Sequence, residues 1–297
     1  MPALCLGEAF VELVCERRAA HGSPGEAFVP RLGGAALGIA LTAARHGASV
    51  ALGGGAGDDP WGRWLRDRLA AADVDASWFQ LVSGAQTALA VVHCQADGEP
   101  DVQLYGEPIG RTMAAVAGGL EQAVERCDAL VLGSSTLVGQ DERAVTMAAR
   151  ERALAAEKPV LFAPQLSPRR WRSVADAAAS ANACVPGALL VCATRADAEL
   201  LTGEPDPDRA ALALLKAGAR MVVLTLEAGG AGAILRGQHR ADLAGVSSPA
   251  VAIGVLTGVL LAHLERTGYY PPAVAAGLRE ALAAAAASAE ERWGAPA

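Results

Sequence analysis

The apolar residues of this chain fall into short runs separated by glycine, proline and polar residues, and the runs show two kinds of spacing. Continuous runs typical of buried strands stand at 128–132, 159–162, 188–192 and 220–226, whereas 140–156 has the spacing of a helix. Strands that alternate with helices over short connections predict βαβ units on a largely parallel sheet. Such sheets bind ligands beyond the carboxyl ends of their strands, so the residues after each strand are the first functional candidates.

The first apolar run, 4–13, is predicted to be one opening strand that carries Gly7, Glu8 and Glu12. Carboxylates at a strand end commonly face solvent, but they can also contact a ligand. For Glu12 the sequence leaves both interpretations open.

Two β-rich segments, 87–94 and 101–105, flank the turn sequence Asp97-Gly98-Glu99-Pro100 and are predicted to pair as a hairpin. Towards the end of the chain, 247–264 predicts an apolar helix and 278–297 an alanine-rich one.

Glycines are concentrated between 33 and 62. The pair Gly33-Gly34 precedes an apolar run of helical spacing that ends at Gly47. A strand at 49–52, a glycine loop at 53–57 and a second helix from Pro60 are predicted to follow. Glycines at a helix N-terminus let the backbone approach a bound hydroxyl or anion, although they can also serve only to tighten connections.

Length, hydrophobic content, net charge and cysteine spacing exclude several classes of protein. A chain of 297 residues that is 52% hydrophobic can bury a large core, and its net charge of −7 argues against a nucleic-acid partner. The six cysteines lack the C-x-x-C spacing of zinc or redox sites, so we expect core residues in a reducing compartment. The longest apolar stretch, 250–264, is shorter than the roughly 20 residues of a membrane span, and no basic segment precedes the first strand. We therefore expect a soluble, cytoplasmic protein without a signal peptide.

The glycine-rich stretch resembles the first signature of the ribokinase-like (PfkB) carbohydrate kinases, in the style of fructokinases and 2-keto-3-deoxygluconate kinases. The matching positions are Gly33, Gly34, Ala40, Gly47, Gly57, Asp59 and Gly62. The resemblance implies one domain over 1–297, a three-layer α/β/α sandwich with a largely parallel sheet. It also implies a small β lid, from about 9–32 and 85–108, that can serve for dimerisation. Such enzymes transfer phosphate from ATP, with Mg²⁺, to a hydroxyl of a sugar or sugar acid.

The family's substrate contacts are only partly present. Gly33 and Gly34 are kept, and Glu12 stands where the family has an aspartate that binds a sugar hydroxyl. Gly38 replaces an asparagine that binds substrate hydroxyls, and Gly106 replaces an arginine. A later motif keeps Pro164 and Trp171 but has Ala163, Gln165 and Ser167 in place of its three polar residues.

The nucleotide contacts are altered as well. Thr194 and Asp197 stand at the family's Asn-x-x-Glu, which organises Mg²⁺ and phosphate, so the resemblance makes Asp197 the metal candidate. Thr194 is equally suited to cap a helix. In the phosphate loop, Thr225 and Gly230 are kept, whereas Glu227 replaces a glycine and would repel a triphosphate.

The stretch 247–254 aligns with the family's second signature, where glycine amides at a helix N-terminus hold the transferring phosphate and an aspartate takes the proton from the attacking hydroxyl. Here Ala252 keeps its place, Val251 and Ile253 replace the glycines, and Gly254 replaces the aspartate. A positioned general base typically raises the rate of the catalysed reaction by about 10² to 10⁴, so its loss should leave little turnover.

Three functional hypotheses follow. The first is a catalytically silent or severely impaired kinase homologue that acts by binding, with no cofactor or with a partner such as a second copy or an active relative paired through the lid. The second is an active ATP-dependent sugar or sugar-acid kinase that uses displaced residues. The third is a sensor that binds a sugar or other polyol-like ligand.

Overall fold

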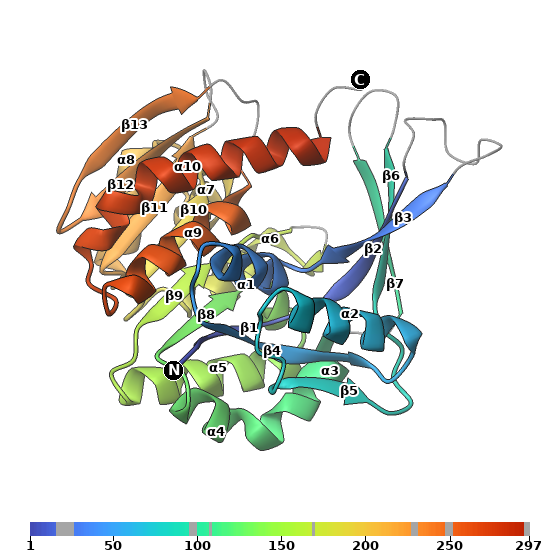
Figure 1. The fold of residues 1–297 in the computed structure, drawn as a ribbon. Helices are drawn as coiled ribbons and strands as arrows, with labels where there is room; N and C mark the ends of the chain where they lie inside the picture. Colours follow the sequence, from blue (N-terminus) through green and yellow to red (C-terminus); the bar gives the residue numbers. More distant parts are fainter. Residues whose placement is uncertain are drawn as a thin grey trace.

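The computed structural model describes residues 1–15, 27–94, 100–106, 109–167, 170–226, 231–246 and 252–293 (Figure 1). Strands of the main sheet are β1 (Ala3–Leu6), β4 (Val50–Gly57), β5 (Phe79–Val82), β8 (Ala129–Gly133), β9 (Val160–Ala163), β10 (Leu190–Thr194), β11 (Met221–Leu226), β12 (Ala231–Gly237) and β13 (Ala241–Val246). Within the described residues their order is β13-β12-β11-β10-β9-β8-β1-β4-β5. The strands from β11 to β5 pair in parallel, and β12 and β13 add an antiparallel edge.

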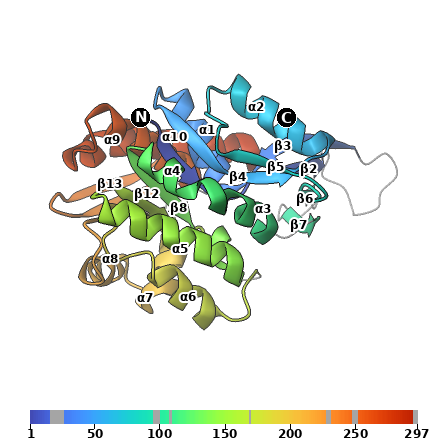
Figure 2. The same cartoon turned by 90° about the horizontal axis from the view of Figure 1, so that it is seen from below.

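Helices cover both faces of this sheet (Figures 1 and 2). One face carries α1 (Ala35–Arg45), α2 (Pro60–Ala71), α9 (Ile253–Arg266) and α10 (Pro272–Trp293). The other carries α3 (Ile109–Val116), α4 (Leu120–Glu125), α5 (Gln140–Ala155), α6 (Val174–Asn182), α7 (Arg195–Thr202) and α8 (Pro207–Lys216). The predicted three-layer sandwich with a largely parallel sheet is confirmed.

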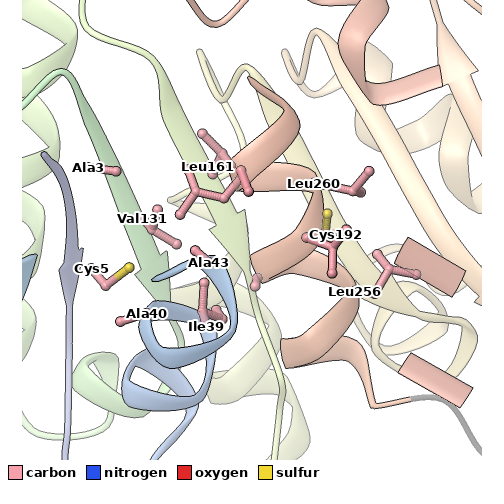
Figure 3. Packing of buried hydrophobic residues seen from close by; sticks show 14 of the residues in the cluster. Ala3, Cys5, Ile39, Ala40, Ala43, Val131, Leu161, Cys192, Leu256 and Leu260 are labelled. Carbon is pink, nitrogen blue, oxygen red and sulfur yellow. The ribbon is translucent and has the colours of Figure 1, made fainter. Parts of the chain in front are cut away.

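Two hydrophobic cores result, one on each face of the sheet. Successive residues of β1 alternate between them, with Ala3 and Cys5 in one core and Leu4 and Leu6 in the other. Figure 3 shows the first core, where Cys5 and other strand residues lie beside the side chains of α1 and α9. Five cysteines of the described chain are buried, as the sequence predicted: Cys5, Cys15, Cys127, Cys184 and Cys192. No helix within the described ranges is long and apolar enough to cross a bilayer.

α1 and α9 pack closely because α9 has a glycine where the two helices meet. A Cβ on Gly258 would lie 2.6 Å from Cβ of Thr42 and 2.8 Å from the carbonyl oxygen of Ile39. This contact fixes the position of both helices, and both begin near the carboxyl ends of the sheet strands.

A second, four-stranded sheet stands beside the main one (Figure 1). Its strands are β2 (Phe10–Cys15), β3 (Phe28–Gly33), β6 (Leu89–Cys94) and β7 (Pro100–Tyr105), in the order β3-β2-β6-β7. The predicted antiparallel hairpin of β6 and β7 is confirmed, while most of its turn, 95–99, lies outside the described residues.

Three sequence predictions about elements were wrong. The apolar run 4–13 is two strands, β1 and β2, which belong to different sheets and are separated at 7–9. The predicted loop 53–57 is the second half of the fully buried strand β4. The last helix begins at Pro272, six residues earlier than its alanine-rich sequence suggested.

Candidate functional site

A cavity of about 490 Å³ lies where the carboxyl ends of the main-sheet strands meet the small sheet. Its lining comes from the β1–β2 connection, the start of α1, the small sheet and the segments after β8 and β9. The residues are Glu8, Phe10, Glu12, Leu32, Gly33, Gly34, Ala35, Gly38, Ala88, Val102, Leu104, Tyr105, Gly106, Ser135, Gln165 and Arg170. The structure thus brings together all four predicted substrate-binding positions: Glu12, Gly33, Gly34 and Gly38.

Glycines form the wall at the start of α1. Gly34 has φ 121°, and a Cβ there would clash with the carbonyl oxygen of Glu8. A Cβ on Gly33 would lie 2.5 Å from the Phe10 ring and 2.6 Å from Cγ of Glu12. Both glycines are therefore required by close packing against the β1–β2 segment. Gly38, by contrast, has no atom within 4 Å of a Cβ position, so the place of the family's asparagine side chain is open space.

Glu8 is a buried carboxylate at the cavity, with only 5% of its surface exposed. Its hydrogen bonds hold the surrounding segments in place. Its Oε1 accepts the backbone N–H of Ala35 at 2.7 Å, which satisfies a helix-start donor that the side-chain-free Gly34 cannot cap. Its Oε2 accepts the hydroxyl of Ser135, which follows β8. Glu8 therefore ties β1, α1 and β8 together at the site.

The small sheet supplies an apolar wall and a constraint on Gly106. Val102 and Leu104 line the cavity beside Phe10. Gly106 has φ 101°, and a Cβ would lie 2.9 Å from the carbonyl oxygen of Thr87. A side chain is strained in that conformation, which accounts locally for the glycine at position 106.

The segment after β9 places two more polar side chains at the cavity. Arg170 donates from Nη2 to the carbonyl oxygen of Ser135 at 3.5 Å. Gln165 has φ 45°, and its Nε2 is buried without a hydrogen-bond partner among the residues that the structure describes. Such an orphaned amide costs about 1–3 kcal/mol, and it faces the first turn of α9.

Gly254, at the position expected for the catalytic aspartate, is the second residue of α9. A Cβ on Gly254 would lie 3.7 Å from both Oε1 and Nε2 of Gln165 and 3.9 Å from Ile39. Residue 254 therefore has room for a side chain that would meet Gln165 at the cavity wall. Ala252, the N-cap residue, donates its N–H to the carbonyl oxygen of Ala285 on α10 at 3.2 Å.

Thr194 and Asp197 form a reciprocal cap at the start of α7. Thr194 Oγ1 accepts the Asp197 N–H at 3.0 Å, and Asp197 Oδ2 accepts the Thr194 N–H at 3.3 Å. Oδ1 of Asp197 accepts the N–H of Leu166 at 3.0 Å. The capping role of Thr194 is thus confirmed. No cluster of three or more His, Cys, Asp or Glu side chains suited to a metal occurs in the described part of the chain.

The remaining nucleotide candidates lie on β11 and after it. Thr225 is fully buried beside Thr194 on the neighbouring strand, and in the described part of the chain its Oγ1 has no hydrogen-bond partner. Glu227 and Gly230 lie outside the described residues.

Asp59 serves the scaffold. Its Oδ1 accepts the Gly62 N–H at 2.8 Å and the Thr87 hydroxyl at 2.7 Å, and its Oδ2 accepts the Thr87 N–H at 2.8 Å. Burial raises the pKa of Asp59, but these hydrogen bonds outweigh burial and lower it overall. Asp59 therefore joins the start of α2 to the segment that leads into β6.

A model of the pfkB family carbohydrate kinases matches residues 3–251. The chain belongs to this family. The matched stretch contains the glycine-rich signature and ends before Gly254, the position where the sequence predicts a catalytic aspartate to be missing.

Curated relatives are plant fructokinases. The chain is 29% identical to Fructokinase-1 of Oryza sativa subsp. japonica over 197 residues, which cover 66% of this chain and 61% of that protein. It is 27% identical to Fructokinase-2 of Solanum lycopersicum over 74% of this chain and 67% of that protein. The chain thus spans about three fifths of the length of the rice relative.

Solved structures share the fold. A PfkB protein from Polaromonas sp. JS666 has a TM-score of 0.80 and 23% identity over 100% of this chain and 97% of that one. A putative Ribokinase II from E. coli has a TM-score of 0.85 and 19% identity over 99% and 94% of the two chains. Fructokinase from Xylella fastidiosa has been solved with bound ATP, at a TM-score of 0.77 and 22% identity over 96% and 91% of the two chains.

Sequence reasoning missed the roles of Glu8, Ser135 and Arg170. Glu8 and Glu12 lie on the same apolar run, and the resemblance predicts a ligand contact only at Glu12. Ser135 follows β8 at the carboxyl edge of the sheet, so the rule that residues after strands carry function could have found it. Arg170 stands three residues beyond Ser167, the last of the three replaced polar positions of the motif, and no spacing rule predicts a role for it.

Proposed function

We propose that this PfkB-family chain binds a sugar or other polyol-like ligand and is catalytically silent or severely impaired as a kinase. Its role is then binding or regulation, with ATP and Mg²⁺ dispensable. The observation that carries the proposal is the pair of Gly254 and Gln165. Where a carboxylate would accept the proton of the attacking hydroxyl, residue 254 has no side chain, and the amide of Gln165, whose Nε2 has no partner among the described residues, stands opposite.

The carboxylates at the cavity do not replace this base. Both oxygens of Glu8 already accept hydrogen bonds, from Ala35 and Ser135. Glu12 belongs to β2 of the small sheet, which lies apart from α9 (Figures 1 and 2). A carboxylate whose oxygens already accept hydrogen bonds is a weaker acceptor for the proton of a ligand hydroxyl.

The phosphate-holding groups support the same conclusion. The N–H of Ala252 donates to Ala285 and is therefore committed within the protein. Loss of one donor to a developing anion typically lowers the rate by about 10² to 10³, and loss of a general base by about 10² to 10⁴. Asp197, the metal candidate, accepts two backbone N–H groups, an arrangement that serves the start of α7.

The cavity has the polar groups and the space that binding of a small ligand requires. Glu12, Ser135, Gln165 and Arg170 offer polar groups, and Gly38 leaves space beside α1. A volume of about 490 Å³ falls in the range of small-molecule sites. We therefore expect a polyol-like ligand to raise the unfolding midpoint whether or not nucleotide is present.

The experiment is a phosphorylation assay with Mg-ATP against a panel of sugars and sugar acids, run beside thermal unfolding with each ligand. We expect no turnover by the natural chain and a raised midpoint with at least one ligand. Measurable phosphorylation by the natural chain would establish the alternative, an active kinase with a displaced base. Gly254→Asp tests whether a restored carboxylate recovers turnover, and Gly254→Ala is its matched control.

We also propose that two copies pair through the small sheet. β7 is an edge strand in the described part of that sheet, and Val102, Leu104 and Tyr105 on it are 47%, 53% and 54% exposed. Sedimentation should show a dimer that Leu104→Lys dissociates. Leu212→Lys, a change at a 50% exposed residue of α8, should leave the dimer intact. A natural chain that sediments as a monomer contradicts this pairing.

A further inference from the structure

Two walls of the cavity at the carboxyl ends of the strands differ in chemistry. The segments after β8 and β9 contribute the hydroxyl of Ser135 and the guanidinium of Arg170. The small sheet contributes the side chains of Phe10, Val102 and Leu104. A small molecule that contacts both walls must therefore present polar groups to one and an apolar surface to the other.

The register of the strands places the apolar side chains on one face of the small sheet. Glu12 of β2 pairs with Ala90 of β6, and Ala90 pairs with Leu104 of β7, so these three form one row across the sheet. Residues two apart along a strand share a face, which adds Phe10 and Val102 to the same face. Among the described residues of this face that line the cavity, Glu12 has the one polar side chain.

The rest of the chain leaves much of this apolar face uncovered. The side chains of Val102 and Leu104 are 47% and 53% exposed, although both line the cavity. Gly38 of α1 also lines the cavity and leaves open space where a side chain would stand. An apolar group placed against this face would remove it from water, which is favourable in proportion to the area covered.

A free sugar matches such a face poorly because its hydroxyl groups surround the whole ring. Hydroxyls turned towards Phe10, Val102 and Leu104 would give up their hydrogen bonds to water without gaining a partner, which costs free energy. An aryl or alkyl substituent in the same place has no polar group to desolvate. The small-sheet wall therefore favours a ligand with an apolar part.

The opposite wall is suited to hydroxyl groups. Nη2 of Arg170 donates to the carbonyl oxygen of Ser135 at 3.5 Å, and within the described residues this is the one hydrogen bond of the guanidinium. A guanidinium has five N–H donors, so Arg170 keeps donors for a ligand. The Ser135 hydroxyl donates to Glu8, and its oxygen can still accept. A sugar hydroxyl, which both donates and accepts, can satisfy these groups.

We propose that the ligand of this cavity is a sugar or other polyol that carries an aryl or alkyl substituent. Its hydroxyls contact Ser135 and Arg170, and its substituent packs against Phe10, Val102 and Leu104. This inference rests on the binding role proposed above for the same cavity, and it adds the class of ligand, an amphipathic glycoside in place of a free sugar.

The test is calorimetric titration of the full chain, without nucleotide, with the methyl and the phenyl glycosides of glucose, fructose and ribose. For at least one of the three sugars we expect the phenyl glycoside to bind about tenfold more tightly than the methyl glycoside, equivalent to about 1.4 kcal/mol. Val102→Thr nearly keeps the shape of the side chain but adds a hydroxyl, so it should reduce this ratio to about threefold. Val174→Thr, at a 52% exposed residue of α6, is the matched control and should leave the ratio unchanged.

Other results overturn the inference. Equal affinities of the methyl and phenyl glycosides for all three sugars would exclude an apolar subsite, although the proposed binding of sugars would stand. Absence of saturable binding at millimolar concentration would contradict both. An unchanged ratio in Val102→Thr would place the substituent away from the small sheet.

Two further measurements separate this inference from the other proposals. Sedimentation of the same samples shows whether Val102→Thr alters pairing, and a ratio that falls only together with loss of a dimer would assign the apolar face to a second copy and overturn the ligand class. Phosphorylation of a bound phenyl glycoside in the presence of Mg-ATP would contradict a silent kinase and leave the ligand class intact.

Discussion

The side-chain amide of Gln165 faces the α-carbon of Gly254 across the first turn of α9. A Cβ on residue 254 would be in ordinary contact, 3.7 Å, with both the Oε1 and the Nε2 of Gln165, and Nε2 is buried with no partner in the described structure. The amide of Gln165 is thus a hydrogen-bond donor beside Gly254, which has no side chain to accept from it.

Gly254→Asp should therefore stabilise the protein. A carboxylate at the second helical position interacts favourably with the helix dipole and can accept from Gln165 Nε2. Gly254→Ala gains only helix propensity. In urea unfolding we expect the aspartate variant to exceed the alanine variant by about 0.5–1.5 kcal/mol. An aspartate variant less stable than the alanine variant would show that Gln165 does not act as a donor to this position.

Glu8→Ala should lower the free energy of unfolding by about 2 kcal/mol, because it leaves the Ala35 N–H and the Ser135 hydroxyl without their acceptor. Glu8→Gln is the matched control. Its amide oxygen can still accept from Ala35, so we expect a clearly smaller loss in the same denaturant titration. Equal losses in the two variants would mean that the negative charge, and not the acceptor, is what the site requires.

Two helical glycines should respond in opposite directions to alanine. Gly258→Ala forces a methyl group against Thr42 and Ile39 and should cost about 1–3 kcal/mol. Gly38→Ala has open space around its Cβ and should gain about 0.5–1 kcal/mol from reduced backbone entropy in the unfolded chain. Thermal unfolding of the pair measures both. A neutral Gly258→Ala would mean that α1 and α9 separate at little cost.

Stability should fall in acid through Asp59. Its folded pKa lies below the value in the unfolded chain, so the stabilisation is fully present above the unfolded pKa of about 3.9 and is lost as the pH falls through the folded value. Asp59→Asn should flatten the dependence of the unfolding free energy on pH from about pH 5 downward. Asp58→Asn, in an exposed pair with Arg63, is the control and should change this slope little. An unchanged slope in Asp59→Asn would assign the acid sensitivity elsewhere.

The sequence predicted the parallel sheet and its helices because their hydrophobic patterns are local. Where the predicted element boundaries were wrong, the boundary is set by contacts with residues far away in the sequence. The run 4–13 is apolar throughout, and only the close approach of residues 7–9 to α1 and β4 divides it into two strands. Residues 53–57 have turn composition, yet parallel pairing with β1 and β5 makes them a buried strand.

The candidate site was predicted in outline only. The resemblance located Gly33, Gly34, Gly38 and Glu12, and the cavity brings these four together. The buried bonds of Glu8 join segments 27 and 127 residues apart, and no spacing along the chain signals such partners. The amide of Gln165 likewise acquires its importance only from α9, which arrives almost a hundred residues later.

The glycines of β4 and α2 form a seam where backbone touches backbone. A Cβ on Gly54 would clash with the Gly7 carbonyl, one on Gly57 would lie 2.7 Å from the Thr87 nitrogen, and one on Gly62 would clash with the Gly57 carbonyl. These contacts need no ligand, so a chain that abandoned phosphoryl transfer would still have to keep these residues in order to fold. The glycine motif by which the family is recognised therefore indicates common ancestry and a shared fold. It would be retained in a descendant that no longer catalysed phosphoryl transfer.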